Sequence, residues 1–391
     1  MAIWGMPIVS VDAMRQAFFR DARAKYGDIV YWSKPADAKF QFTTPNASTY
    51  YAYFNYNTRQ GPLVLEVPAA SGATRLSGSL IGAWQAPLAD IGPDGEDKGQ
   101  GGRYLLMPPA IARRDPPDYI AVPSDTYNGY GLLRVTPASS SESDVAAALN
   151  LVKKLRLYPL ARTSAPPEQR FIDMAGTLFD GSVRFDDTFF DSLARMVDEE
   201  PIQQRDLVAM GQLHSIGIQK GRPFTPDQAT RDVLRRAADE AHLTFMENAM
   251  VGDPFWPDKH WLQPAIVGPK TGFAYETGDR LEIDERGMIF FLAFAAPKKL
   301  GASSFYVGAF RDNAGDSFRG DRLYRLHVPA HVPAKQSWSA TIYDAETSCF
   351  IRDSPRLGVD SFDQKIQRNA DGSVEVFVGP KPPAGYESNW I

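Results

Sequence analysis

Aromatic and amide residues alternate in one stretch near the start of the chain, between residues 50 and 57. In a strand, Tyr51, Tyr53, Asn55 and Asn57 project from one face, and the intervening residues project from the other. Phenols and amides on a shared face are the mixture that lines pockets for small molecules or sugars. Tyrosine is also a good strand former, so a purely structural strand explains the alternation equally well.

A second group of polar residues runs from Arg311 to Arg322 and holds three arginines and three aspartates. The guanidinium of Arg311, beside Asp312, could orient a carboxylate, a phosphate or a sugar hydroxyl, because its planar fork matches such groups. The structural alternative is a salt-bridged hairpin tip between two strands, and the sequence favours this alternative.

Two signatures of hydrolases and metalloenzymes are incomplete in this chain. Residues 315–318 echo the nucleophile block of a class of esterases, but the late Asp-x-x-His of that class and any Gly-x-Ser-x-Gly elbow are missing. His327 and His331 have the spacing of zinc ligands on a helix, but Pro329 and Pro333 interrupt a helix there. In an extended strand the two rings lie about 13 Å apart, so we predict no metal site and keep His327 as a ligand-binding candidate.

Four acidic residues crowd a glycine-rich loop and could offer oxygen ligands to calcium: Asp90, Asp94, Glu96 and Asp97. Their spacing matches no defined calcium loop, and Lys98 and Arg103 lie nearby, which favours a solvated turn. We therefore predict no cofactor, with calcium as the alternative. Arg103 joins the candidates for binding a ligand.

The composition is that of a folded soluble protein. The 42 basic residues are interleaved with 47 acidic ones, which gives a formal charge of -5 and predicts no nucleic-acid partner. The single cysteine, Cys349, excludes an intrachain disulfide and a thiolate-cage metal site. No apolar run approaches the roughly 20 residues of a membrane span. The first residues carry no export signal, so we expect a cytoplasmic protein, or a periplasmic or secreted one if a signal has been removed.

Hydrophobic periodicity divides the chain into elements. It predicts a first helix over residues 11–25 and then short strands that include 49–56, 61–68 and 104–109. A cap at residues 139–142 predicts a helix through Leu155, followed by helices over 187–199, 206–216 and 226–249. Strands return after Asp258 and are predicted over 303–310, 322–328, 336–343 and 373–378.

Two β-rich portions around a helical stretch predict an α+β protein that is mostly β, because a doubly wound sheet would alternate strand and helix throughout. We expect a β-rich domain with a leading helix over 1–140, a helical segment over 141–257 and a jelly-roll-like β-sandwich over 258–391.

Several strings of residues resemble a bacterial family of paired domains of unknown function, numbers 1254 and 1214. In the first half they are 50–56, 61–68, 87–93, 101–109 and 127–131, and 216–224 resembles the connecting helical segment. In the second half they are 310–313, 323–329 and 338–344. The resemblance implies a jelly-roll-like second domain and no agreed chemistry. Family members extend beyond both ends of this chain, so we expect it to be shortened at both ends.

Two functions fit these observations. The first is a hydrolase or lyase that acts on a small organic substrate where the amino-terminal sheet meets the jelly roll. The second is a non-enzymatic binding or assembly protein, a possible homo-oligomer, that uses the jelly roll as a scaffold. The enzyme hypothesis requires the candidate residues to converge on one cavity: Tyr51, Tyr53, Asn55, Arg103, Arg311, Asp312 and His327.

Overall fold

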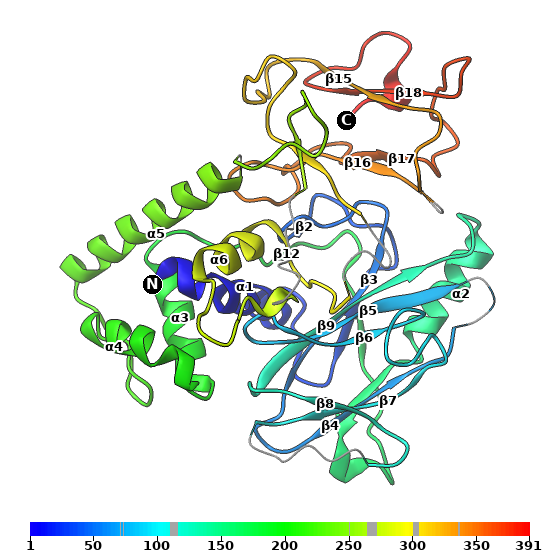
Figure 1. Cartoon of the computed structure of the whole chain (residues 1–391). Coiled ribbons are helices and arrows are strands. Elements are labelled where there is room, and N and C mark those ends of the chain that lie inside the picture. Colours follow the sequence, from blue (N-terminus) through cyan, green and yellow to red (C-terminus); the bar gives the residue numbers. More distant parts are fainter. Residues whose placement is uncertain are drawn as a thin grey trace.

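Two mostly antiparallel sheets form the N-terminal part of the computed structural model (Figure 1). The structure describes residues 1–70, 72, 74–109, 116–249, 251–263, 272–299, 305–334 and 337–391. The larger sheet has the order β11-β1-β3-β9-β5-β6, with bounds Phe171–Asp173, Ile29–Tyr31, Tyr50–Asn57, Asn128–Thr136, Arg75–Gly82 and Pro87–Ile91. The smaller sheet has the order β10-β4-β7-β8, with bounds Arg156–Pro159, Leu63–Val67, Gly102–Met107 and Ile120–Pro123.

Strands from the predicted helical segment complete these sheets. Strand β10 pairs with β4, and β11 pairs in parallel with β1. A separate two-stranded pair joins β12 (Phe179–Asp180) to β2 (Phe40–Gln41). Residues 156–180 therefore belong structurally with the N-terminal sheets, and the helices that follow begin at residue 188.

The aromatic strand β3 is buried on both faces. Phe54 and Tyr56 point into the core between the two sheets, which helix α2 (Glu142–Val152) also covers. Their cross-strand partners on β9 are Gly131 and Gly129. A Cβ atom at Gly131 would lie 2.2 Å from the ring of Phe54, so the ring occupies space that only glycine leaves open.

Helix α1 (Ala2–Arg20) covers the opposite face of the larger sheet. Almost every residue of α1 from Ala2 to Phe18 is buried, because the sheet, α3, α5 and α6 surround it. The predicted helix over 11–25 begins nine residues too late and ends five too late. A helix that is apolar all round has no polar face, so its first half shows no period for a sequence pattern to detect.

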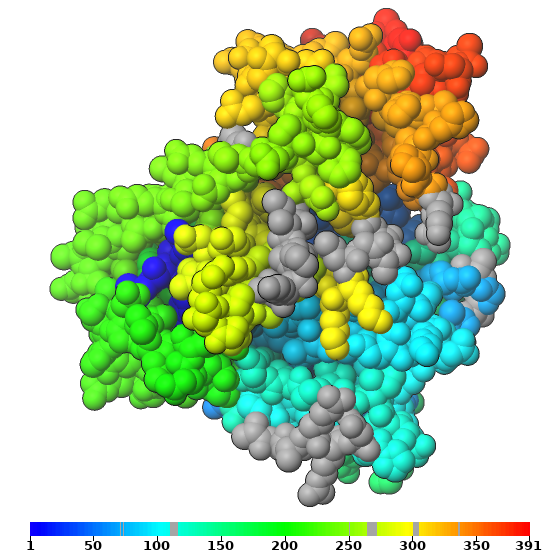
Figure 2. Space-filling model, in the orientation of Figure 1, coloured from blue at the N-terminus to red at the C-terminus, as the bar shows by residue number. Residues whose placement is uncertain are grey.

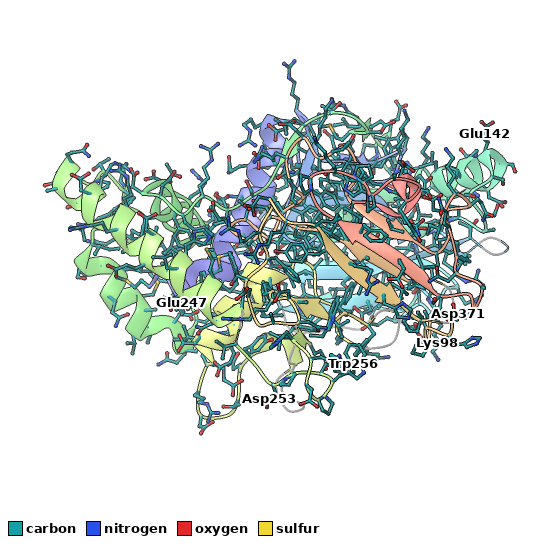
Figure 3. All side chains as sticks on the ribbon, turned by 90° about the horizontal axis from the view of Figure 1, so that it is seen from above. Lys98, Glu142, Glu247, Asp253, Trp256 and Asp371 are labelled. Carbon is teal, nitrogen blue, oxygen red and sulfur yellow. The ribbon has the colours of Figure 1, made fainter. Side chains whose placement is uncertain are left out.

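The helices after residue 187 lie on one side of the molecule, where Glu247 marks α5 in Figure 3 and Glu142 of α2 marks the opposite side. Their bounds are α3 Thr188–Glu199, α4 Leu207–Ser215, α5 Gln228–Ala249 and α6 Ile283–Leu292. Helix α6 has no counterpart in the sequence prediction. Gly287 lets α6 approach α1 closely, since a Cβ atom there would lie 2.8 Å from the carbonyl oxygen of Ile3.

The C-terminal part contains short strand pairs, and its residues after 310 are coloured orange to red in Figure 2. The pairs are β13 (Trp261–Leu262) with β14 (Gly308–Ala309), β15 (Tyr324–Val328) with β18 (Val374–Val378), and β16 (Ser339–Thr341) with β17 (Gly358–Asp360). Strands β15 to β18 surround a small core. Residues 303, 304 and 336 of two predicted strands lie outside the described residues. The mixed α+β class is confirmed, whereas two-stranded pairs do not establish a jelly roll.

We expect the change Gly131→Ala to lower the free energy of unfolding by about 1–3 kcal/mol, because the new methyl group overlaps the Phe54 ring. Urea denaturation measures this loss. The matched control is Gly211→Ala in α4, where no atom lies within 4 Å of the new Cβ atom and alanine favours the helix. Equal stability of the two variants would contradict the packing argument.

Candidate functional site

A cleft of about 410 Å³ lies between the N-terminal sheets and the segment that leads into α6. This volume lies within the range of pockets for small ligands. Figure 2 shows the yellow 272–299 segment lying against the blue and cyan sheet residues. The residues that line the cleft are Trp84, Ala86, Leu88, Pro123, Ser124, Asp125, Arg205, Ala274, Glu276 and Arg286.

Arg286 lies at the buried end of the cleft and lacks the partners that a buried arginine usually has. It is 2% exposed, its guanidinium carbon lies 5.0 Å from the centre of the Trp84 ring, and one terminal nitrogen donates to the carbonyl oxygen of Trp4 at 3.3 Å. Its Nε has no hydrogen-bond partner among the described residues, and none of their carboxylates forms an ion pair with it. Burial lowers the pKa of Arg286 to about 10, so the side chain stays positive at neutral pH.

A cavity of about 10 Å³, the size of one water molecule, lies behind Trp84. Trp4, Trp84, Glu200 and Asp206 contribute to its lining. The indole nitrogen of Trp84 and Oδ1 of Asp206 have no hydrogen-bond partner among the described residues. Burial raises the pKa of Asp206, an effect that the charges of Arg205 and Arg286 oppose.

Arg205 connects the two walls of the cleft at its solvent-exposed edge. One terminal nitrogen lies 2.9 Å from Oδ2 of Asp125, which follows β8, and the other lies 2.5 Å from Oε2 of Glu276. The side chains of Asp125 and Glu276 are 41% and 40% exposed, in contrast with Arg286 at the inner end. The cleft thus has a buried cation inside and two carboxylates near solvent.

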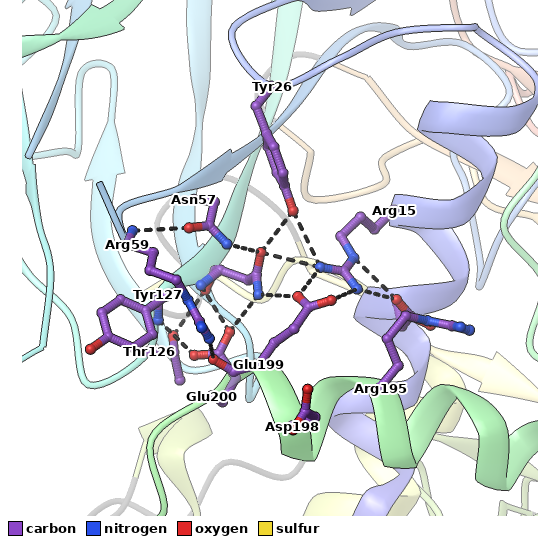
Figure 4. Close-up of polar contacts among 12 residues, drawn as sticks. Arg15, Tyr26, Asn57, Arg59, Thr126, Tyr127, Arg195, Asp198, Glu199 and Glu200 are labelled. Carbon is purple, nitrogen blue, oxygen red and sulfur yellow. Dashed lines mark hydrogen bonds and ion pairs between the residues drawn. The ribbon is translucent and has the colours of Figure 1, made fainter. Parts of the chain in front are cut away.

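A buried polar network next to the cleft holds the end of α3 in place (Figure 4). Arg15 on α1 donates to both carboxylate oxygens of Glu199, at 2.5 and 3.1 Å, and to Asp12 at 2.7 Å. It also donates to the side-chain oxygen of Asn128 on β9 at 3.2 Å. Although burial opposes the charge, the hydrogen bond to Glu199 and the charge of Asp12 raise the pKa of Arg15. One guanidinium therefore connects α1, α3 and β9.

Glu200 connects the C-terminal end of α3 to β9 through hydrogen bonds. Its carboxylate accepts the backbone N–H groups of Tyr127 and Asn128 at 2.6 and 2.9 Å, and the amide of Asn128 at 2.7 Å. Burial raises the pKa of Glu200, which these three donors oppose. Lys220 donates to the carbonyl oxygens of residues 197, 198 and 200 and so satisfies the end of α3. Residues 201–206 leave this anchored end and carry Arg205 and Asp206 to the cleft and the small cavity.

The residues predicted on β3 lie in the core. Tyr51, Tyr53 and Asn55 are each at most 1% exposed. The Tyr51 hydroxyl accepts the backbone N–H of Asn46, and the Tyr53 hydroxyl donates to the side-chain oxygen of Asn55 at 3.1 Å. Helix α1 packs against this face of the sheet, so the strand presents no open surface.

The other predicted residues lie in separate parts of the molecule. Arg103 on β7 stacks over the ring of Tyr119 at 4.6 Å. Arg311 donates to the carbonyl oxygen of Gly315, and Asp312 accepts two backbone N–H groups of the same exposed turn. His327 on β15 lies 2.7 Å from the carboxylate of its cross-strand partner Glu375. None of the seven predicted residues, all of them described, lines the cleft.

The buried carboxylates of the acidic residues in and after β6 accept hydrogen bonds from backbone N–H groups of the protein. Asp90 accepts the backbone N–H groups of Lys298 and Lys299, and Asp97 accepts those of Gly92 and Gly101. Lys98, labelled in Figure 3, is exposed. Within the described ranges, no three His, Cys, Asp or Glu side chains form a group that could hold a metal ion, and no helix is long and apolar enough to cross a membrane.

Sequence reasoning missed the residues that build this site. The strongest available signal is Arg286, a charged residue that directly precedes the apolar run from residue 287 to 296. A second is the Glu199-Glu200-Pro201 string at a predicted helix end, where carboxylates are unfavourable unless partners neutralise them. Neither signal indicates which partners the folded chain supplies.

Replacing Arg15 with glutamine should lower the free energy of unfolding by about 1.5–3 kcal/mol, because Asp12 keeps only Arg195 as a cation and the partly exposed Glu199 loses its own. Denaturant unfolding measures the change. Arg20→Gln on the same helix removes an ion pair with Asp21 in which the arginine is 54% exposed, and it should change stability by less than about 1 kcal/mol. A similar loss of stability in both variants would show that the network around Arg15 contributes no more to stability than a surface ion pair does.

Comparison with known proteins gives family matches and matches to solved structures. Residues 26–159 match the model of a protein of unknown function, DUF1254, and residues 303–391 match that of another, DUF1214. The search of curated proteins finds no match. The cleft combines residues of the first matched region with Arg205, Ala274, Glu276 and Arg286, which lie between the two regions.

Two crystal structures are similar to this chain. A protein from Vibrio parahaemolyticus has a TM-score of 0.58 at 15% identity, over 100% of this chain and 89% of that one. An uncharacterised protein from Burkholderia cenocepacia has a TM-score of 0.33 at 14% identity, over 98% of this chain and 79% of that one. The Vibrio structure shares the fold, and the two family matches together cover more than half of the chain. The chain therefore belongs to the family of proteins that pair a DUF1254 domain with a DUF1214 domain.

Proposed function

We propose that this protein binds a small organic acid in the cleft that Trp84 and Arg286 line. The observation that carries this proposal is the buried guanidinium of Arg286, whose Nε has no partner among the described residues and which lines a cleft of about 410 Å³. Arg286 contacts the Trp4 carbonyl oxygen and the Trp84 ring and lies in the field of Asp206 and Glu276, but it forms no ion pair among the described residues. A bound carboxylate would supply that ion pair and offset the cost of burying the charge.

The remainder of the lining suits the carbon body of such a ligand. Trp84, Leu88 and Pro123 supply apolar surface, and Ala86 and Ala274 leave room between the walls. A mostly apolar cleft with a few converging polar groups is the usual form of a small-molecule site. An organic acid therefore matches the lining better than an inorganic anion, which has no apolar part.

The hydrolase or lyase reaction expected from the sequence is proposed for this same cleft. Arg286 would hold the carboxylate of the substrate, and Asp125 or Glu276 would accept or donate a proton near solvent. The competing proposal, assembly of a homo-oligomer on a jelly-roll scaffold, needs no occupant in the cleft. Light scattering distinguishes the two, because only assembly requires a large closed particle.

The change Arg286→Met should weaken binding of hexanoate or benzoate at least about tenfold, because it removes a charge-assisted hydrogen bond. The stability of the ligand-free protein should change by less than about 3 kcal/mol, because removal of a desolvated charge offsets the loss of the hydrogen bond to Trp4 and of the positive charge near Asp206. Calorimetric titration and urea denaturation measure the two effects. Arg103→Met is the matched control, since Arg103 also stacks on an aromatic ring but lies outside the cleft. Unchanged affinity in Arg286→Met would refute the binding site.

A screen of ester, glycoside, lactone and β-elimination substrates that carry a carboxylate tests the proposed reaction. We expect turnover by the unmodified chain, a loss of at least about tenfold in kcat/KM with Arg286→Met, and no loss with Arg103→Met. Binding of carboxylates without turnover of any of these substrates would reject the hydrolase or lyase proposal and leave a binding protein.

A further inference from the structure

The cleft has a positive side chain at its inner end and two negative side chains at its outer end. At the inner end, Arg286 is positive and almost fully buried. At the outer end, Asp125 and Glu276 each bind Arg205 through one carboxylate oxygen, Oδ2 and Oε2 respectively. These three outer side chains carry a formal charge of about −1, since one arginine faces two carboxylates. A ligand with a carboxylate at its inner end therefore meets a negative field at its outer end.

Both outer carboxylates keep an oxygen that can accept further hydrogen bonds. Their side chains are 41% and 40% exposed, and a carboxylate oxygen that accepts one N–H has room for additional donors. Lys298 donates to the carbonyl oxygen of Leu88, which lines the cleft, and forms an ion pair with Glu96. Lys298 therefore leaves the outer negative charge in place.

We infer that the ligand is zwitterionic, with a carboxylate at Arg286 and an ammonium group at Asp125 and Glu276, separated by a short apolar body that packs on Trp84. This inference rests on the proposed function and adds the second charged group. Amino acids whose amine and carboxylate are several carbons apart, and small amines that carry an acid group, form this class. A simple aliphatic acid offers a carboxylate to Arg286 but no positive group to Asp125 and Glu276.

Matched pairs of ligands test the inference directly. Butanoate, hexanoate and octanoate are compared with their ω-amino counterparts by calorimetric titration of the full chain. At one chain length we expect the amino acid to bind about fivefold more tightly, because charge-assisted contacts at a partly exposed site are worth roughly this much. The double variant Asp125→Asn, Glu276→Gln should abolish that preference and leave the plain acid bound at least as tightly. Asp118→Asn, an exposed aspartate outside the cleft, should retain the preference.

The outcomes separate this inference from the proposed function. If plain acids bind in a manner that depends on Arg286 but no amino acid binds more tightly at any length, the zwitterion inference is wrong and the organic-acid site stands. If the amino acids bind more tightly and the double variant keeps their preference, the assignment of the outer carboxylates is wrong. If neither kind of ligand binds, both proposals fail.

Discussion

The buried arginine of helix α1 is the constraint on which the site depends. Helix α1 is surrounded by protein, so the charges of Asp12 and Arg15 must be neutralised inside the core. Arg15 achieves this by binding Glu199 and Asn128, which fixes the end of α3 against β9. Because the chain continues from this end into residues 201–206, neutralisation of the core charge also determines where Arg205 and Asp206 lie.

The protein contains two buried arginines with opposite environments. Arg15 binds two carboxylates and an amide, whereas Arg286 donates only to the carbonyl oxygen of Trp4 among the described residues. The same low-dielectric interior raises the pKa of Arg15, through its acidic partners, and lowers that of Arg286. Arg15 therefore has its acidic partners within the fold, whereas Nε of Arg286 has no hydrogen-bond partner among the described residues.

The cleft is lined by residues of the DUF1254 region and of the connecting segment, and by none of the DUF1214 region. The C-terminal part docks on the edge of the N-terminal part through contacts such as Gln41 to the carbonyl oxygen of Phe350 and Tyr343 to that of Pro45. The cleft instead lies between the N-terminal sheets and residues 205–286, which lie outside both matched regions. The connecting segment is therefore part of the proposed site rather than only a linker.

The sequence by itself determined the α+β class, the aromatic strand β3 and most helices after residue 140, because periodicity and caps are local properties. It did not reveal the first half of α1, since a helix buried on all sides lacks a polar face. It also did not reveal helix α6, in which only the first turn is exposed. Only the tertiary structure decided that the tyrosines of β3 are core residues and that Trp84, Arg205 and Arg286 meet at one cleft. The physical reason is that the role of a charge depends on its partners, and these come from distant segments, 71 residues apart for Arg205 and Glu276 and 282 for Arg286 and Trp4.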